Sequence, residues 1–305
     1  MMNRYLISCL NRFKKSKKTA TDPYRFSGLR RSLTGLLGGL ESTLIKSRAE
    51  VGHLSSPVLF NSIPKSGTNL LKNILVVLPN ARVVGDLSLA AEKDQNDERL
   101  DLVKSRISDL RPGCIYGGHI PYSTAIADWL CKHEVKQLFL YRDPRDVTVS
   151  LHHYVMEKRK RHAYYELYAS LGSNSDRLFG TICGVGEGQT VYKVSQSSIP
   201  NVKVMFDAFE KWLKDENTFP LRYEDLMNPI DNGAEVVTKL LEFLNVPYNQ
   251  ELVETILSRG KDPSKSRTFR RGGSGAWREE YSEKHVEVFR RVAGDLLERW
   301  GYAWD

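Results

Sequence analysis

PVLFNSIPKSGTNLLK, the stretch Pro57–Lys72, combines a strand, a tight loop and the start of a helix. The apolar run Val58–Phe60 predicts a buried strand, and a short loop of proline, serine and glycine follows it. The helical pattern is carried by Leu70, Leu71, Ile74 and Leu75. A strand that turns into a helix N-terminus presents backbone N–H groups and the positive end of the helix dipole to an anion. Lys65 adds a cation, and Ser66 and Thr68 add hydroxyl groups, so the stretch predicts a phosphate or sulfate site.

The loop differs from the nucleotide-binding pattern G-x-x-x-x-G-K-[ST]. Its lysine precedes its glycine, and no glycine lies five positions before Lys65. This order argues against an ordinary ATPase. For this stretch alone, a polar strand-to-helix turn with a chance lysine is the alternative interpretation.

A second stretch, VKQLFLYRDPRDVTVS at Val135–Ser150, repeats the strand–turn–helix pattern. Asp143 suits a helix N-cap and Pro144 suits the first helical position, which places Arg142 at the carboxyl end of a strand. Ser150 follows two turns into the helix, on the face of Asp143. Arg142 and Ser150 could together hold a second phosphate, whereas a salt-bridged helix start is the plainer alternative.

A third stretch, FRRGGSGAWR at Phe269–Arg278, places two arginines beside three glycines. This composition suits either a loop that closes over an anion or a basic surface loop. Together, in this order and at these separations, the three stretches resemble the cytosolic-type sulfotransferase family over about residues 56 to 300. Members of that family transfer a sulfuryl group from 3′-phosphoadenosine 5′-phosphosulfate (PAPS) and release adenosine 3′,5′-bisphosphate (PAP).

The resemblance implies a role for each stretch and a catalytic base. The 5′-phosphosulfate loop would comprise Lys65, Ser66, Gly67, Thr68 and Asn69. The 3′-phosphate would be held by Arg142 and Ser150, with help from Arg270, Arg271 and Gly272. The general base would be His119, in the segment GCIYGGHIP, where Cys114–Tyr116 predicts a short strand. A histidine near its ordinary pKa can accept a hydroxyl proton at neutral pH.

The chain departs from the family pattern at four positions. The lysine that usually lies two residues before the catalytic histidine is Gly117, and the aromatic residue that often follows the first loop is Leu70. In the late segment the aspartate is Ala276 and the middle lysine is Arg271. These changes predict a divergent member, and they leave His119 and Lys65 in place.

Charge is concentrated in the first 50 residues. The chain has a formal net charge of +8. Residues 1–50 contain 11 basic and 3 acidic side chains, so they account for the whole excess, and residues 51–305 are balanced. A nucleic-acid-binding domain usually carries its excess charge on the folded part, so no nucleic-acid partner is predicted. We expect a basic extension over 1–50 and a sulfotransferase domain over 51–305. For the extension, a mobile tail, a peripheral membrane-surface helix and an organelle-targeting segment are open alternatives.

No metal site is predicted from the sequence. The four cysteines are scattered, and no pair shows zinc-ligand spacing. His152 and His153 are adjacent, and neighbouring residues on a helix do not share a face. The cysteine pattern suits a reducing compartment, and no secretory signal or membrane span is recognisable, so a cytoplasmic location is expected.

Strand and helix patterns alternate from residue 56 onward, which predicts an α/β fold. The expected architecture is a P-loop-like three-layer fold with a central, mostly parallel sheet flanked by helices. Site residues should then gather at the carboxyl ends of the strands. The functional hypothesis is PAPS-dependent sulfuryl transfer, without a metal, to a small-molecule or glycan acceptor. A nucleotide-dependent kinase and a non-catalytic PAP-binding module are the alternatives, and a homodimer is a further hypothesis.

Overall fold

The computed structural model describes residues 53–87, 97–186, 198–227, 233–260 and 273–304. The chain divides into two compact units, Met1–Gly38 and Gly39–Asp305, and all described residues belong to the second. The predicted extension over 1–50 lies outside the described residues. Within the described part of the chain, no helix is long and apolar enough to cross a membrane.

The centre of the fold is a five-stranded sheet in which every pairing is parallel. Its strands are β1 (Val58–Ser62), β2 (Arg82–Asp86), β3 (Cys114–Gly118), β4 (Lys136–Tyr141) and β5 (Thr218–Arg222). They lie side by side in the order β2-β3-β1-β4-β5. The strands β1, β3 and β4 form where the sequence analysis predicted them, and the predicted central parallel sheet is confirmed.

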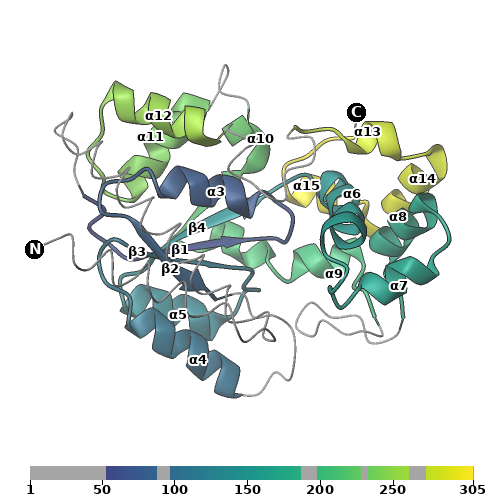
Figure 1. The fold of residues 1–305 in the computed structure, drawn as a ribbon, viewed down its shortest axis with the longest axis horizontal. Coiled ribbons are helices and arrows are strands. Elements are labelled where there is room, and N and C mark those ends of the chain that lie inside the picture. Colours follow the sequence, from purple (N-terminus) through teal and green to yellow (C-terminus); the bar gives the residue numbers. More distant parts are fainter. Residues whose placement is uncertain (1–52, 88–96, 187–197, 228–232, 261–272, 305) are drawn as a thin grey trace, which may run out of the picture. The chain divides into compact units, whose positions relative to one another are not determined.

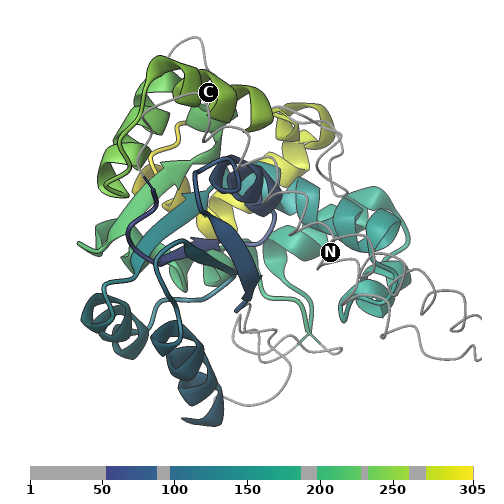
Figure 2. The same ribbon diagram turned by 60° about the vertical axis from the view of Figure 1, so that its left-hand side comes forward.

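Helices cover both faces of this sheet, so the residues of β1 and most residues of β3 and β4 are buried. Leu59 and Phe139 pack into one hydrophobic core, and their neighbours Phe60 and Leu138 pack into the other. The first core includes α4 (Asp97–Ser108) and α5 (Thr124–Lys132), and the second includes α3 (Thr68–Leu75), α11 (Ala234–Phe243) and α12 (Gln250–Gly260). Figure 1 shows these helices above and below the sheet, and Figure 2 shows the green α11 and α12 opposite the blue α4 and α5. The predicted three-layer arrangement is confirmed.

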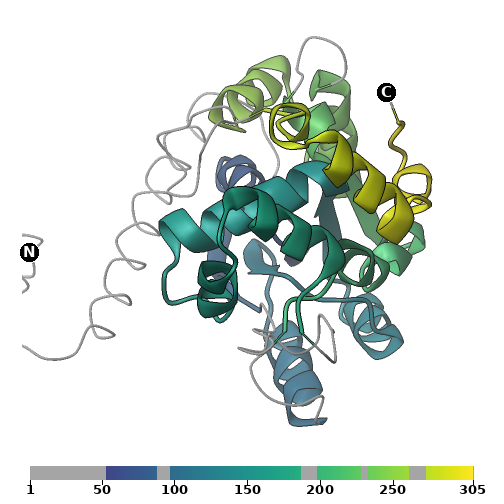
Figure 3. The same ribbon diagram turned by 90° about the vertical axis from the view of Figure 1, so that its right-hand side faces the viewer.

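A further group of helices extends the first core beyond β4. It comprises α6 (Pro144–His153), a π-helix (Tyr154–Lys158), α7 (Tyr165–Ser170), α8 (Asn174–Cys183), α9 (Val202–Asp207), α13 (Trp277–Glu280), α14 (Glu283–Ala293) and α15 (Leu296–Arg299). The short α10 (Tyr223–Met227) follows β5 directly. Figure 3 shows the yellow C-terminal helices beside the teal helices α6 and α8, so distant parts of the chain meet here.

Two stretches with helical apolar spacing are interrupted in the structure. The spacing that runs from Val286 to Trp300 is divided between α14 and α15 at Gly294, a residue with low helix propensity. The spacing around Phe206–Leu213 forms a helix only as far as Asp207, and a 3₁₀ turn follows over Glu210–Lys214. That tighter turn buries Trp212 completely and lets its indole N–H donate to the Ile120 carbonyl over 2.9 Å.

Candidate active site

Three strand ends bring the predicted site residues to one edge of the sheet. Because β1 lies between β3 and β4, the loops after these strands are neighbours. They carry Lys65, His119 and Arg142 respectively. The chain leaves β1 toward β2 and later crosses from β3 to β4, so the strand order reverses here. Such switch points are where open parallel sheets bind ligands.

The loop between β1 and α3 has a conformation suited to an anion. Gly67 caps α3 with φ of 102°, and Lys65 also has a positive φ of 72°. A Cβ atom at Gly67 would lie 2.7 Å from the Tyr223 ring, so only glycine fits this turn. Ser66 is fully buried, and its hydroxyl has no hydrogen-bond partner among the described residues. A buried hydroxyl of this kind needs an acceptor or donor from elsewhere, and a bound phosphate group would supply one.

Lys65 lies in an electropositive, desolvated position. Its Nζ is 3.6 Å from the centre of the Tyr154 ring. Burial, together with the nearby cations Arg142 and Arg159, lowers the pKa of Lys65 to about 8. Burial and repulsion by the two arginines both disfavour the charged form of Lys65. An anion beside its ammonium group would offset both effects, so the position favours an anionic ligand.

His119 follows β3 directly and is fixed by the last residue of β1. Its Nδ1 lies 2.8 Å from the Ser62 carbonyl oxygen and 3.2 Å from the Ser62 hydroxyl. Since a carbonyl only accepts, Nδ1 carries the proton and Nε2 carries the lone pair. Burial is the largest influence on the pKa of His119 and lowers it, as does Lys65, while the Ser62 carbonyl and Asp86 oppose them. The ring is therefore neutral at pH 7 and can accept a proton through Nε2.

A chain of hydroxyl contacts joins this histidine to the anion loop. The Ser62 hydroxyl is 2.9 Å from the Thr68 hydroxyl at the start of α3, and it also contacts His119 Nδ1. The predicted base and the predicted 5′ loop thus share Ser62 as a common neighbour. Their relative position is set by β1 itself and not by a flexible surface loop.

Arg142 links the end of β4 to the late glycine-rich segment. Its Nη2 donates to Asp146 over 3.1 Å and to the Gly273 carbonyl over 2.7 Å, and its guanidinium lies 4.5 Å from the Tyr223 ring centre. Its buried Nε has no hydrogen-bond partner among the described residues. Asp143 caps α6 as predicted and accepts from the Arg145 N–H, and Pro144 is the first helical residue. Arg142 therefore forms the salt bridge with Asp146 that a salt-bridged helix start would have. Its buried Nε–H donor is still without a partner among the described residues.

Of the other residues predicted to hold the 3′-phosphate, the structure describes only Ser150. Ser150 is half-buried in α6, two turns beyond the N-cap. Arg270, Arg271 and Gly272 lie outside the described residues. The adjoining segment is held by Asp146, which accepts the backbone N–H of Gly275 over 2.8 Å and of Trp277 over 3.0 Å. The late segment is thus tied to the helix that carries Ser150.

The four departures from the family pattern have different structural settings. At Gly117, a Cβ atom would lie 2.2 Å from the Phe60 ring, so that ring occupies the space a lysine side chain would need. Leu70 is buried in the core between α3 and the sheet. Ala276 precedes α13 directly, and Arg271 is outside the described residues. The Phe60 ring therefore leaves no room for a larger side chain at position 117 unless the ring moves.

Several residues of the site were not identified from the sequence. Ser62, Asp146 and Tyr154 contact predicted site residues or the segment beside them, but their partners are 4 to 131 positions away along the chain. Asp146 offered one signal, because it shares a helix face with Arg142 at the (i, i+4) spacing of a salt bridge. Nothing in the local sequence distinguishes Ser62 or Tyr154.

The alternative kinase would need a magnesium-binding acid near the loop, and Glu224, just after β5, is already engaged in hydrogen bonds. One carboxylate oxygen accepts the Asp143 N–H over 3.0 Å, and the other accepts the Tyr302 hydroxyl over 2.8 Å. Burial is the largest influence on its pKa and raises it. Both carboxylate oxygens are therefore occupied by protein donors, which disfavours a role for Glu224 as a magnesium ligand.

The fold and this edge define the class, an α/β protein whose first strand-to-helix loop, at a switch point of the sheet, has a geometry suited to an anion. The family model of the sulfotransferase domain matches residues 55–301, so the chain belongs to the sulfotransferase family. A mouse sulfotransferase, SULT7A1 complexed with PAP, has a TM-score of 0.52 and 17% identity over 82% of this chain and 89% of its own. Retinol dehydratase in a complex with retinol and PAP has a TM-score of 0.54 and 15% identity over 82% and 84%. No curated protein sequence matches the chain.

Proposed function

We propose that this protein is a PAPS-dependent sulfotransferase that acts on a hydroxyl or amine of a small-molecule or glycan acceptor. The observation that carries the proposal is the contact set through Ser62, which places a neutral His119 beside the anion loop of Lys65. Membership of the sulfotransferase family supports the reaction class. Two of the similar structures are complexes with PAP, which supports the donor nucleotide.

The described residues fit a ligand with two anionic groups. The orphaned Ser66 hydroxyl and the N-terminus of α3 suit the 5′ group, with Gly67, Thr68 and Asn69 around it. The remaining Nε of Arg142 suits a phosphate at the 3′ position, with Ser150 on the same helix as Asp146. Arg270, Arg271 and Gly272 stay a prediction for the same phosphate.

When bound, PAPS supplies the sulfuryl group, and PAP leaves with the electron pair of the broken S–O bond. His119 Nε2 takes the proton of the acceptor hydroxyl as the acceptor oxygen bonds to sulfur, because Nδ1–H is held on the Ser62 carbonyl. Lys65 offsets the negative charge that grows on the departing phosphate oxygen. These groups lie on rigid strand ends, so positioning and electrostatics provide the catalysis, and this scheme needs no metal.

The first test is calorimetric titration of the purified protein with PAP and, separately, with ATP and Mg²⁺. Tight PAP binding without an ATP response supports the donor assignment, and acceptors are then screened with labelled PAPS. The reverse result would favour the kinase. His119→Ala should lose transfer and keep PAP binding, because His119 contacts the reacting proton and not the nucleotide. PAP binding by the wild type with no transfer to any acceptor would favour a non-catalytic binding module.

A further inference from the structure

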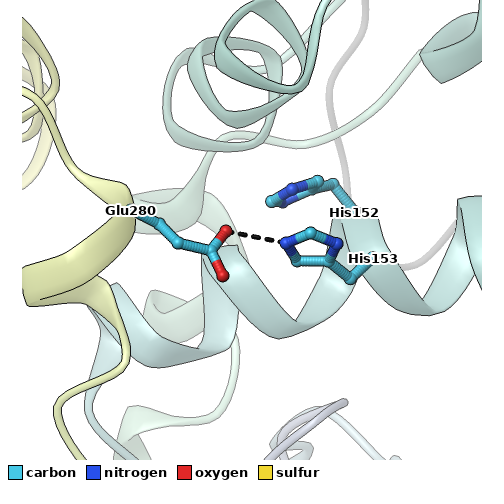
Figure 4. A group of neighbouring side chains, drawn as sticks. All are labelled: His152, His153 and Glu280. Carbon is cyan, nitrogen blue, oxygen red and sulfur yellow. Dashed lines mark hydrogen bonds and ion pairs between the residues drawn. The ribbon is translucent and has the colours of Figure 1, made fainter. Parts of the chain in front are cut away.

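A compact group of possible metal ligands lies outside the proposed transfer site. His152 and His153 at the end of α6 face Glu280 of α13 (Figure 4). One ligand atom from each residue lies within 4.8 Å of the other two, and no other group of this kind occurs among the described residues. The two histidines and the glutamate come from parts of the chain 127 positions apart, so the fold brings them together.

The two rings approach each other, contrary to the expectation from their adjacency. Their centres are 4.1 Å apart and the ring planes are inclined by 36°. The backbone at His153 is still helical, with φ of −60° and ψ of −42°. The rings therefore meet through their side-chain torsions, and the sequence-based argument that adjacent helical histidines point apart is wrong here. A π-helix starts at the next residue, Tyr154, and such helices are frequent at functional sites.

Both histidines are oriented as metal ligands usually are. His152 Nδ1 lies 3.3 Å from the Thr148 carbonyl, which only accepts, so the lone pair of the neutral ring is on Nε2. His153 Nδ1 lies 2.8 Å from Glu157, and its Nε2 lies 2.7 Å from Glu280. In metal-bound histidines, one ring nitrogen usually binds the metal, and the other is held by a carboxylate or a carbonyl in the outer shell.

The local charge also favours a divalent cation. Glu157 and Glu280 both contact His153, so even a doubly protonated imidazolium leaves this trio with a net charge of −1. If a divalent ion replaces the Nε2 proton, the two carboxylates balance it. His153 and Glu280 have side chains only 14% and 20% exposed, so the balance is made partly out of water.

We propose that His152, His153 and Glu280 bind one divalent transition-metal ion of the zinc class, with Glu157 orienting His153. Binding releases the Nε2 proton of His153 to solvent, and water completes the coordination. Two imidazoles and a carboxylate are a known donor set for Zn²⁺, whereas Ca²⁺ and Mg²⁺ prefer oxygen ligands. Bonds of about 2.0–2.2 Å in a tetrahedron separate ligand atoms by roughly 3.4 Å. The ligand atoms lie within 4.8 Å of one another and His153 Nε2 is 2.7 Å from Glu280, so metal binding requires small rotations about the side-chain torsions of these residues.

The ion would join two elements that serve the transfer site. The helix α6 contains Ser150, and α13 starts at Trp277, whose N–H is held by Asp146. A metal bridge from α6 to Glu280 would add a second tie between the same elements. Its role is thus structural, and it leaves the metal-free transfer scheme unchanged.

The test uses the full-length protein after treatment with a chelator. Titration with Zn²⁺ by calorimetry should give one site per chain with a proton released, and the unfolding temperature should rise. Co²⁺ bound in place of Zn²⁺ should give the visible absorption bands that are typical of tetrahedral coordination. Glu280→Gln and His153→Gln should each weaken Zn²⁺ binding at least tenfold, and Glu157→Gln should weaken it about tenfold to a hundredfold.

Matched controls separate this site from adventitious binding. Glu279→Gln changes the neighbouring carboxylate on α13, and His133→Gln removes an imidazole that belongs to no ligand group among the described residues. Both should bind Zn²⁺ as the wild type does. The proposal is overturned if the wild type binds no Zn²⁺ at micromolar concentration. It is also overturned if folded Glu280→Gln and Glu157→Gln variants bind Zn²⁺ like the Glu279→Gln control.

Discussion

Asp146→Ala removes three hydrogen bonds at once and should loosen the late segment from α6. The fully buried carboxylate accepts from the Arg142 guanidinium and from the backbone N–H groups of Gly275 and Trp277. Alanine keeps the helix but leaves these donors without their acceptor. The segment should then separate from α6, and Arg142 should lose the group that orients it.

The size of the effect follows from burial. Hydrogen bonds to a charged group contribute about 1.5–3 kcal/mol each, and breaking a buried ion pair by removing one partner costs about 3–5 kcal/mol. The Arg142 side chain is 12% exposed, so water compensates part of its loss. We expect a decrease of about 3–4 kcal/mol in the free energy of unfolding. At about 2–4 °C per kcal/mol, the unfolding temperature should fall by about 6–16 °C. Asp146→Asn keeps an oxygen acceptor and should lose less.

The assay is thermal unfolding by circular dichroism, combined with PAP titration well below the transition. The matched control is Asp207→Ala, which removes a surface ion pair with Arg299. Exposed pairs contribute about 0–1 kcal/mol, so the control should shift the transition by only a few degrees. Asp146→Ala should also weaken PAP binding at least tenfold, whereas Asp207→Ala should not. A shift for Asp146→Ala no larger than that of the control would refute this reasoning.

Three further predictions concern the strand ends. Gly117→Ala should cost about 1–3 kcal/mol by overpacking, seen as a lower unfolding temperature, while Gly273→Ala, with nothing within 4 Å, should be neutral. Ser62→Ala keeps the carbonyl that holds His119, so kcat should fall less than tenfold; a loss as large as that of His119→Ala would contradict this. Lys65→Met should stabilise the chain below pH 8, with its advantage vanishing as pH rises from about 8 to 10.5, because the folded wild type gives up the proton that the unfolded chain still holds. Denaturant titrations across that pH range measure this difference, and a pH-independent difference would contradict it.

The fold could be predicted from the sequence because the patterns that indicate strands and helices lie within short segments of the chain. Short, mostly apolar runs marked β1, β3 and β4, and Pro144 after Asp143 marked the start of α6. Alternation of strands and helices implies a covered parallel sheet, and a parallel sheet implies that strand ends meet at one edge. Lys65, His119 and Arg142 could therefore be assigned to one edge before any contact was known. Gly294 shows the limit of this reasoning, since an apolar stripe continued through a residue where the helix breaks.

The contacts within the site could not be predicted in the same way. Phe60 fills the space beside Gly117 because β1 and β3 pair in a register that places them opposite each other. Register depends on the whole sheet and is not visible in either segment. The cation–π contact of Lys65 with Tyr154 likewise depends on where α6 passes into its π-helix. Residue types and the order of the motifs thus identify the kind of chemistry. Strand register and helix irregularities decide which neighbouring side chains contact the site residues.

The lowered pKa of Lys65 leads to a measurable consequence for nucleotide binding. At pH 8, close to that pKa, about half of the lysines are neutral in the free protein. A bound anion favours the ammonium form, so PAP binding should take up about half a proton at pH 8 and almost none at pH 6.5. Calorimetry in buffers of different ionisation enthalpy measures this uptake directly. Lys65→Met should show no such dependence, and Lys72→Met, which changes an exposed lysine of α3, should behave like the wild type. Equal uptake at both pH values, or uptake that survives in Lys65→Met, would mean that Lys65 is not the group that meets the nucleotide.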